Sequence, residues 1–202
     1  TMCANLDVAI IGCGWAGTQH ARAVRKGLAR LRWTVDSNLA RAQALAHEQA
    51  GTQATADYRA PLSDPQVDAV IICLPHNLHA PVAIDAARAG KHVLCEKPIA
   101  ATLAEADAMI AAAGNARVVL MVAENERYNP LYRKMRELLD AGAIGRPALV
   151  QSSRECYLVR SFVQDRPWFL DRRAAAGGMM MSGGVHTFET MRLLLGELAA
   201  VQ

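Results

Sequence analysis

The stretch Asp-Val-Ala-Ile-Ile-Gly-Cys-Gly-Trp-Ala-Gly, residues 7–17, decides the fold of this chain. Its first part, Asp7–Ile11, is an apolar run with the length of a buried strand. Glycines follow in a G-x-G-x-x-G pattern at Gly12, Gly14 and Gly17, and a helical pattern begins within them. A strand, a glycine turn and a helix in this order indicate the first βα unit of a dinucleotide-binding domain. The glycines alone could form a plain turn, so the flanking strand and helix are essential to the prediction.

Each glycine has a physical role in such a loop. Gly12 permits the tight turn, Gly14 lets a pyrophosphate approach the backbone, and Gly17 lets the helix pack closely on the strand. The phosphate would lie on free N–H groups at the positive end of the helix. We therefore expect the whole loop to bind the cofactor, through Gly12, Cys13, Gly14, Trp15, Ala16 and Gly17.

An acidic residue stands where the second strand is expected to end. Asp36 lies 19 positions after Gly17, where its carboxylate would accept hydrogen bonds from the adenosine ribose and repel a 2′-phosphate. NAD is therefore favoured over NADP, with Asp36 and Ser37 in the cofactor site. Asn38 and Arg41 nearby, together with Ser37, leave NADP open as an alternative. A solvated loop acid is the other interpretation of Asp36.

Residues 1–123 alternate short apolar runs with amphipathic stretches. The pattern predicts strands over 7–11, 32–35, 68–74, 92–94 and 117–122, and helices over 15–29, 39–50, 78–89 and 103–113. Strands that alternate with helices of this length indicate βαβ units. We expect an α/β fold, a Rossmann doubly wound parallel sheet that forms a dinucleotide-binding domain.

The pattern changes near Asn125. A helix is expected over 130–141, a loosely alternating antiparallel strand over 148–157, an irregular loop over 166–178 and a helix over 186–195. We expect residues 124–202 to begin an α+β domain for substrate binding and oligomerisation. One or two strands leave an apolar face and unpaired edges exposed. We therefore expect this domain to be incomplete, so that a further part of the chain or another subunit covers it.

The composition excludes several classes of protein. Of 202 residues, 52% are hydrophobic and 20% are charged, and the net charge is +3, as in an ordinary globular chain. There is no block of Lys and Arg of the kind that binds nucleic acid. Apolar runs fall short of the ~20 residues of a membrane span. We therefore expect neither a nucleic-acid nor a membrane partner.

The cysteines favour a reducing compartment. They are far apart and form no C-x-x-C pair: Cys3, Cys13, Cys73, Cys95 and Cys156. Neither a disulfide framework nor a metal site is expected from this spacing. The first residues also lack the basic, apolar and small-residue order of a signal peptide. A cytoplasmic location is the expectation.

Three further motifs point to a family. Glu96-Lys97-Pro98 follows a short expected strand, Leu74–His79 reads Leu-Pro-His-Asn-Leu-His, and a glycine-rich segment, Gly177–His186, ends in a histidine. Together with the glycine loop, they stand in the order and spacing of the Gfo/Idh/MocA oxidoreductases. The chain resembles that family from Val8 to its last residue.

The resemblance implies a two-domain NAD(P)-dependent oxidoreductase. Such an enzyme transfers a hydride between nicotinamide and a hydroxyl carbon of a polyol, inositol or sugar-like substrate. Its second domain is an open antiparallel sheet that covers the substrate and often builds the subunit interface, so a homo-oligomer is expected.

The resemblance also assigns residues to the cofactor site. Lys97 would lie beside the nicotinamide and the substrate hydroxyl, and Glu96 would help to orient the cofactor. Asn125 and Arg127 match a motif at the domain junction, and Asn125 is expected to bind the cofactor. Further residues expected to line the cofactor cleft are Leu74, Pro75, Asn77 and His79.

Oxidation of a secondary alcohol also needs a group that removes the hydroxyl proton. A histidine, with a pKa of ~6.5 in solution, suits that task near neutral pH. We expect His186 to be the general base and Lys97 to polarise the oxygen, or to act as the base itself. Tyr128 and Trp168 are candidate substrate contacts, with simple packing as the alternative for both.

The resemblance breaks at two positions around His186. Members of the family usually carry an Asp four residues before the histidine and another three residues after it. This chain has Ser182 and Glu189 there. Because a serine holds no negative charge, any support that an Asp at this position gives the histidine is absent here.

Two other functions stay open at this point. A nucleotide-binding regulator of the same family would keep the cofactor cleft without turnover, and Ser182 favours that interpretation. A reductase of a non-sugar substrate, such as a dihydrodiol, would keep the catalytic groups. Retention of both Lys97 and His186 favours an enzyme.

We also expect a cis peptide bond at Lys97-Pro98, because X–Pro bonds lose most of the trans preference.

Overall fold

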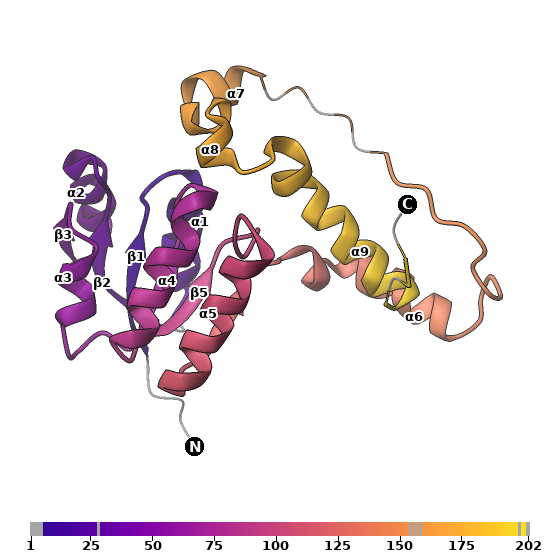
Figure 1. Cartoon of the computed structure of the whole chain (residues 1–202), viewed down its shortest axis with the longest axis horizontal. Coiled ribbons are helices and arrows are strands. Elements are labelled where there is room, and N and C mark those ends of the chain that lie inside the picture. The colour runs from indigo at the N-terminus through magenta and orange to yellow at the C-terminus, as the bar shows by residue number, and fades with distance from the viewer. Residues whose placement is uncertain are drawn as a thin grey trace. The chain divides into compact units, whose positions relative to one another are not determined.

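The computed structural model describes residues 6–27, 29–153, 155, 157, 159–197, 199 and 200. Cys3 and Cys156 lie outside the described residues. The chain divides into two compact units, 1–123 and 124–202 (Figure 1).

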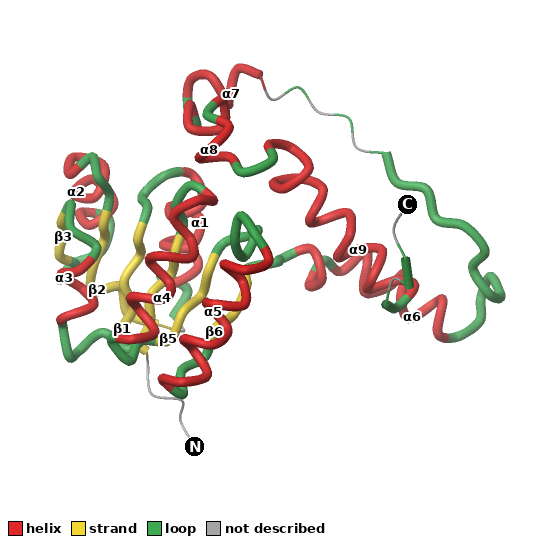
Figure 2. The backbone as a smooth tube through the Cα atoms, viewed as in Figure 1, coloured by secondary structure: helices red, strands yellow, loops and turns green. Residues whose placement is uncertain are grey.

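The first unit contains a six-stranded parallel sheet in the order β3-β2-β1-β4-β5-β6 (Figure 2). This is the Rossmann strand order, so the predicted fold class is confirmed. The strands are β1 Leu6–Ile11, β2 Ala29–Val35, β3 Gln53–Thr55, β4 Ala69–Ile72, β5 His92–Cys95 and β6 Leu120–Val122.

Helices cover both faces of this sheet. They are α1 Trp15–Val24, α2 Leu39–His47, α3 Arg59–Ser63, α4 His79–Arg88 and α5 Leu103–Ala116, with a short 3₁₀ helix, η1, at His76–Leu78. Alternate residues of β1 enter separate buried clusters. Val8 and Ile10 pack with residues of α1 and α2, whereas Ala9 and Ile11 pack with residues of α3, α4 and α5. Burial on both faces explains why β1 reads as a continuous apolar run.

Several expected boundaries were wrong by two or more residues, and the first helix differed most. The helix expected over 15–29 ends at Val24, because the chain reverses at Gly27, which has φ +104°. Ala29 instead pairs with Leu6 as the first residue of β2. The three-residue strand β3 and the five-residue helix α3 were not predicted, since segments this short carry too few residues for a period to show.

In the second unit the described residues form helices. These are α6 Pro130–Asp140, α7 Val159–Gln164, α8 Arg172–Ala175 and α9 Val185–Leu195, with 3₁₀ helices η2 Glu126–Tyr128 and η3 Pro167–Leu170 and a π-helix η4 Met180–Gly184. The loop expected over 166–178 thus contains η3 and α8. Asp171 begins α8 by accepting hydrogen bonds from the N–H groups of Arg173 and Ala174.

The strand expected over 148–157 is wrong for the residues that the structure describes. Residues 148–153, 155 and 157 form neither helix nor strand. A strand needs a neighbour to accept its backbone hydrogen bonds, and the described part of the second unit offers no other strand. Leu149 is 82% exposed, so this alternating stretch also has no buried face here.

Candidate functional site

The loop between β1 and α1 requires glycine at two positions. Gly12 has φ +100°, and a Cβ there would lie 2.2 Å from the carbonyl oxygen of Cys73. A Cβ at Gly17 would lie 2.0 Å from the carbonyl oxygen of Gly12. Since backbone atoms block both places, the turn and the close helix packing exist only with glycine.

Gly14 differs from these two because it borders open space. No atom lies within 4 Å of a Cβ built on it, and it precedes α1 with no side-chain cap. The first N–H groups of a helix have no acceptor within the helix, and the helix dipole favours an anion there. The start of α1 therefore fits a dinucleotide phosphate.

The loop side chains divide between core and surface. Trp15 is 69% exposed, whereas the Cys13 side chain is buried and its Sγ donates to the carbonyl of Val35 at 3.4 Å. Burial, with the nearby charge of Asp36, raises the pKa of the Cys13 thiol to about 12. The Cys13 side chain is therefore not available to a ligand, whereas Trp15 is accessible.

The glycine loop lies at the point where the strand order reverses. β1 pairs with β2 on one side and with β4 on the other. The Cys73 N–H donates to the carbonyl of Ile11 at 2.7 Å, so the loops that follow β1 and β4 adjoin. Ligands of open α/β sheets bind in the crevice at this switch point, beyond the carboxyl ends of the strands.

Asp36 is tied to the glycine loop. Its Oδ2 accepts the Cys13 N–H at 2.9 Å, and its Oδ1 accepts the Asn38 N–H at 2.9 Å. A carboxylate has about four acceptor positions, so two remain for a ribose. Ser37 beside it is exposed, and the Asn38 side chain caps α2 by accepting the Ala40 N–H.

The residues after β4 differ in their access to solvent. Leu74 and Pro75 are half-buried and Asn77 is exposed, as a cleft lining requires. His79, in contrast, is 0% exposed, which differs from the expectation that it lines the cleft. Its Nδ1 lies 2.7 Å from the carbonyl oxygen of Pro98, and its Nε2 lies 2.9 Å from that of Leu74. Burial lowers the pKa of His79, so we assign it to holding the two loops together.

Glu96 and Lys97 follow β5 directly. The Glu96 Oε1 lies 2.9 Å from Nε2 of His20 in α1, and its Oε2 accepts the Lys97 N–H at 3.2 Å. Burial alone would raise the pKa of Glu96, but the hydrogen bond from His20 and the charges of His20 and Lys97 outweigh it and lower that pKa. Lys97 is half-buried, and the Lys97-Pro98 bond is cis, as predicted. Glu96 thus links α1 to the backbone of Lys97.

His20 was missed by sequence reasoning. It lies three residues after Gly17, inside a helix whose sequence gives no separate signal for it. Only the fold brings it within reach of Glu96, 76 residues later.

His186 stands in the first turn of α9, directly after the π-helix η4. Its Nδ1 lies 2.7 Å from Oε1 of Glu124, and the two side chains are 13% and 11% exposed. The absence of an Asp at position 182 therefore does not leave His186 without a carboxylate, because Glu124 supplies one from 62 residues earlier in the chain. No sequence motif had singled out Glu124.

The remaining candidates of the second unit lie at or near its surface. Asn125 is exposed before η2, and Tyr128 at the end of η2 is 57% exposed. Trp168 is half-buried and its ring lies 4.5 Å from that of Phe169, with 43° between the planes. Tyr128 is therefore free to contact a ligand, whereas Trp168 already packs within its own segment.

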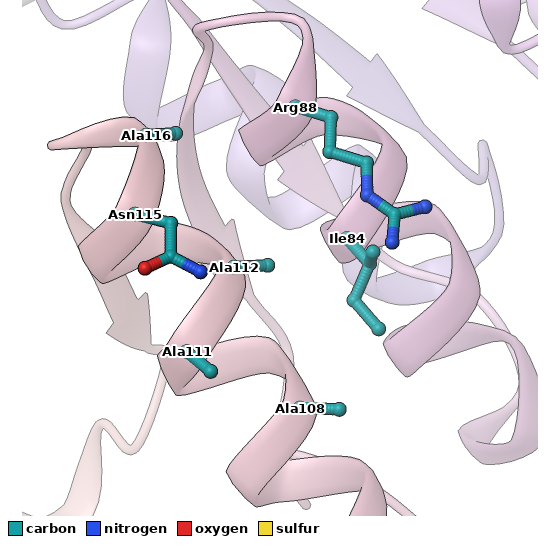
Figure 3. A pocket seen from close by; sticks show the side chains of 7 residues that line it. All are labelled: Ile84, Arg88, Ala108, Ala111, Ala112, Asn115 and Ala116. Carbon is teal, nitrogen blue, oxygen red and sulfur yellow. The ribbon is translucent and has the colours of Figure 1, made fainter.

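One hollow of the first unit lies away from the glycine loop. It is an open groove of about 500 Å³ between α4 and α5, lined by Ile84, Arg88, Ala108, Ala111, Ala112, Asn115 and Ala116 (Figure 3). These residues come from the later turns of both helices, whereas the glycine loop joins the carboxyl end of β1 to the start of a helix. The groove thus lies toward the amino ends of the parallel strands, opposite the glycine loop. The methyl groups of its alanines offer a ligand no polar contact.

Two further observations concern the described residues alone. They contain no group of three His, Cys, Asp or Glu side chains arranged to hold a metal ion. Among their helices, none has the length and apolar character needed to cross a membrane.

Comparison with known families places the chain. The family profile described as an oxidoreductase family with an NAD-binding Rossmann fold matches residues 6–124, and the GFO/IDH/MocA C-terminal domain profile matches residues 132–202. The chain therefore belongs to the Gfo/Idh/MocA oxidoreductase family, as its motifs indicated.

Individual relatives narrow the comparison. Levoglucosan dehydrogenase of Pseudarthrobacter phenanthrenivorans is 34% identical over 98% of this chain and 53% of its own length. Myo-inositol 2-dehydrogenase of Thermotoga maritima is 30% identical over 95% of this chain and 55% of its own length. The solved structure of GenD2 from gentamicin A biosynthesis in complex with NAD has a TM-score of 0.82 and 28% identity, over 97% of this chain and 55% of GenD2. The chain thus spans about half the length of the curated relatives it matches.

Proposed function

We propose that this chain belongs to an NAD(P)-dependent oxidoreductase acting on a CH–OH group of a polyol, inositol or sugar-like substrate. The observation that carries the proposal is a set of hydrogen bonds that connects the glycine loop Gly12–Gly17, called the phosphate cradle below, to Lys97. Gly14 borders open space at the start of α1, and His20 in the same helix binds the Glu96 that holds the Lys97 N–H. The names of the relatives, a levoglucosan dehydrogenase and a myo-inositol 2-dehydrogenase, support the substrate class.

The backbone of Gly12–Gly17 and the carboxylate of Asp36 would hold the dinucleotide. Residues that would line the rest of its site are Ser37, Leu74, Pro75, Asn77, Glu96, Lys97 and Asn125. When bound, the nicotinamide supplies the acceptor for the hydride that leaves the substrate carbon. Because Asp36 would repel a 2′-phosphate, we propose NAD over NADP.

Two side chains would act on the substrate hydroxyl. The Lys97 ammonium stabilises negative charge as it develops on the oxygen, and Nε2 of His186 takes the hydroxyl proton. In the reducing direction His186 returns the proton to the oxygen, while Lys97 stabilises the same negative charge. Proton transfer by a positioned side chain contributes about 10²- to 10⁴-fold to a rate, so loss of either group should be visible in kcat. Tyr128 and Trp168 are proposed substrate contacts of lesser weight.

Turnover with a substrate panel tests this function. The purified protein is mixed with NAD or NADP and with levoglucosan, myo-inositol, open-chain polyols and a dihydrodiol, and the absorbance of the reduced nicotinamide is followed. We expect reduction of NAD with at least one cyclic polyol or sugar, and a fall in kcat of about 100-fold or more in Lys97→Met. Cofactor binding without turnover on the whole panel would favour the regulator instead. Turnover with the dihydrodiol alone would assign the non-sugar alternative.

We also propose that the protein forms homo-oligomers in the cytoplasm. The thiols of Cys13, Cys73 and Cys95 are free, which agrees with a reducing compartment. Apolar side chains on α6, Leu131 at 63% exposed and Leu138 at 47%, offer a surface that a second subunit could cover. Light scattering during size-exclusion chromatography measures the assembly, and a strictly monomeric mass would contradict the oligomer.

A further inference from the structure

Glu124 has a place in the fold that no sequence motif explains. Its Oε1 lies 2.7 Å from Nδ1 of His186, and both side chains are nearly buried. We propose that Glu124 is the positioning residue of His186 and replaces the carboxylate that is absent at Ser182. The proposal deepens the proposed function and rests on it, since His186 is there the group that exchanges the substrate proton.

Both partners of this contact are held by their own segments. The same Oε1 of Glu124 accepts the backbone N–H of Glu126 at 3.0 Å, at the start of η2. The carbonyl oxygen of His186 accepts the hydroxyl of Thr190 at 2.8 Å, one turn further along α9. The Glu124 carboxylate is therefore already ordered by its own segment, which lowers the conformational entropy lost when it meets the imidazole.

A second ion pair joins the same two segments. Nε of Arg127 in η2 lies 3.4 Å from Oε1 of Glu189 in α9, and Glu189 also contacts Arg192 at 3.5 Å. Glu189 stands where the resemblance places an Asp, three residues after the histidine. The pair with Arg127 joins η2 to α9, whereas the pair with Arg192 lies within α9. Glu189 therefore pairs with guanidinium groups, and Glu124 is the carboxylate that contacts the imidazole.

The contact determines which nitrogen of His186 carries the proton. An ionised carboxylate only accepts hydrogen bonds, so Nδ1 donates, and in the neutral imidazole Nε2 then keeps its lone pair. The substrate O–H bond then breaks with its proton moving to Nε2, and the resulting imidazolium lies against the negative charge of Glu124. Glu124 itself stays ionised throughout. A carboxylate that orients a catalytic histidine in this way acts on the rate without touching the substrate.

The first test reads the tautomer directly and needs no turnover. Nitrogen-15 NMR of the histidine-labelled protein should show His186, assigned by comparison with His186→Gln, with its proton on Nδ1. In Glu124→Leu that preference should be lost. A wild-type spectrum with the proton on Nε2 would overturn the proposal, even if the leucine variant fails to fold.

The second test measures kcat and KM of the full-length natural protein. Glu124→Leu should lower kcat by about 10- to 100-fold, part of the total that acid–base catalysis contributes, and leave KM for the cofactor unchanged. Adding Ser182→Asp to that variant should restore part of kcat, which a merely structural role would not allow. Glu137→Gln is the matched control, because it removes an exposed carboxylate of α6 that pairs with Lys134.

The outcomes separate this proposal from the function on which it rests. Unchanged kcat in Glu124→Leu, with an active wild type, would overturn the role of Glu124 alone. Absence of turnover in the wild type together with an Nδ1-protonated His186 would contradict the proposed function and leave the pairing intact.

Discussion

The carboxylate of Asp36 accepts the backbone N–H of Cys13 at 2.9 Å, so one acidic residue joins the end of β2 to the glycine loop. The same residue is the proposed ribose ligand. Its removal therefore affects both the recognition of the ribose and the shape of the phosphate cradle, and two substitutions are needed to separate these effects.

Asp36→Ala should weaken NAD binding by about 10-fold or more, the loss of hydrogen bonds to a charged group, and should weaken NADP binding less. Asp36→Asn keeps an acceptor for the Cys13 N–H and removes the charge, so NADP should gain relative to NAD. Fluorescence titration of the wild type and both variants with NADH and NADPH gives the six dissociation constants to be compared. Equal losses for NAD and NADP in the alanine variant would remove Asp36 from the ribose site.

Substitution by alanine should lower the stability of the fold at Gly17 and the affinity for NAD at Gly14. Gly17→Ala places a Cβ against the carbonyl of Gly12 and should lower the free energy of unfolding by about 2–3 kcal/mol or more. Gly14→Ala meets no neighbour and should stay within about 1 kcal/mol of the wild type, yet bind NAD at least about 10-fold more weakly.

Urea unfolding and NAD titration measure the two quantities separately. Tight NAD binding by a well-folded Gly14→Ala would show that the phosphate does not approach the backbone at this position.

Glu96 should make the first unit sensitive to acid. Its pKa is lower in the folded chain than the ordinary value near 4.3 of an unfolded one, so its charge stabilises the fold above that value. This stabilisation should disappear as the pH falls through the lowered folded pKa. Urea unfolding measured at a series of pH values from 6 downward gives the free energy of unfolding of the wild type and of Glu96→Gln. The difference between these two free energies should narrow only below about pH 4.3. A difference independent of pH would mean that the Glu96 charge contributes nothing.

The thiols of Cys13, Cys73 and Cys95 should react slowly. Burial, together with the charge of Asp36 beside Cys13 and of Glu96 beside Cys95, raises both pKa values to about 12, and burial also raises that of Cys73. Because the thiolate is the reactive form, little is present at neutral pH. Mass spectrometry after iodoacetamide treatment should find these three sites labelled only once urea unfolds the protein. Rapid labelling of Cys13 in the folded protein would contradict its burial.

The sequence predicted the parts of the site that depend on neighbouring residues. The apolar run of β1, the glycine loop and the Glu-Lys-Pro motif each lie within a few positions, and each has the conformation expected of it. His20 with Glu96 and Glu124 with His186 are separated by 76 and 62 residues. Pairs of this kind depend on how helices pack, which a single sequence does not encode in any local pattern.

A substitution at a motif position gave an incomplete prediction. Ser182 correctly indicated that the usual carboxylate is missing, but not that Glu124 lies 2.7 Å from Nδ1 of His186. The proposed role of His186 needs a negative charge near Nδ1, which any segment that packs against α9 can supply. A family pattern around the histidine covers only the segment that carries it.

The hydrogen bond between His20 and Glu96 has a kinetic consequence. α1 begins at the loop proposed to receive the phosphates, and Glu96 also holds the backbone N–H of Lys97. A ligand that fixes the first turn of α1 therefore fixes the backbone from which the lysine extends. The alcohol would meet Lys97 in a fixed position only after the dinucleotide has bound. The two substrates should therefore bind in a compulsory order, with the dinucleotide first. Product-inhibition patterns should show this order in the wild type and drift toward random addition in His20→Leu.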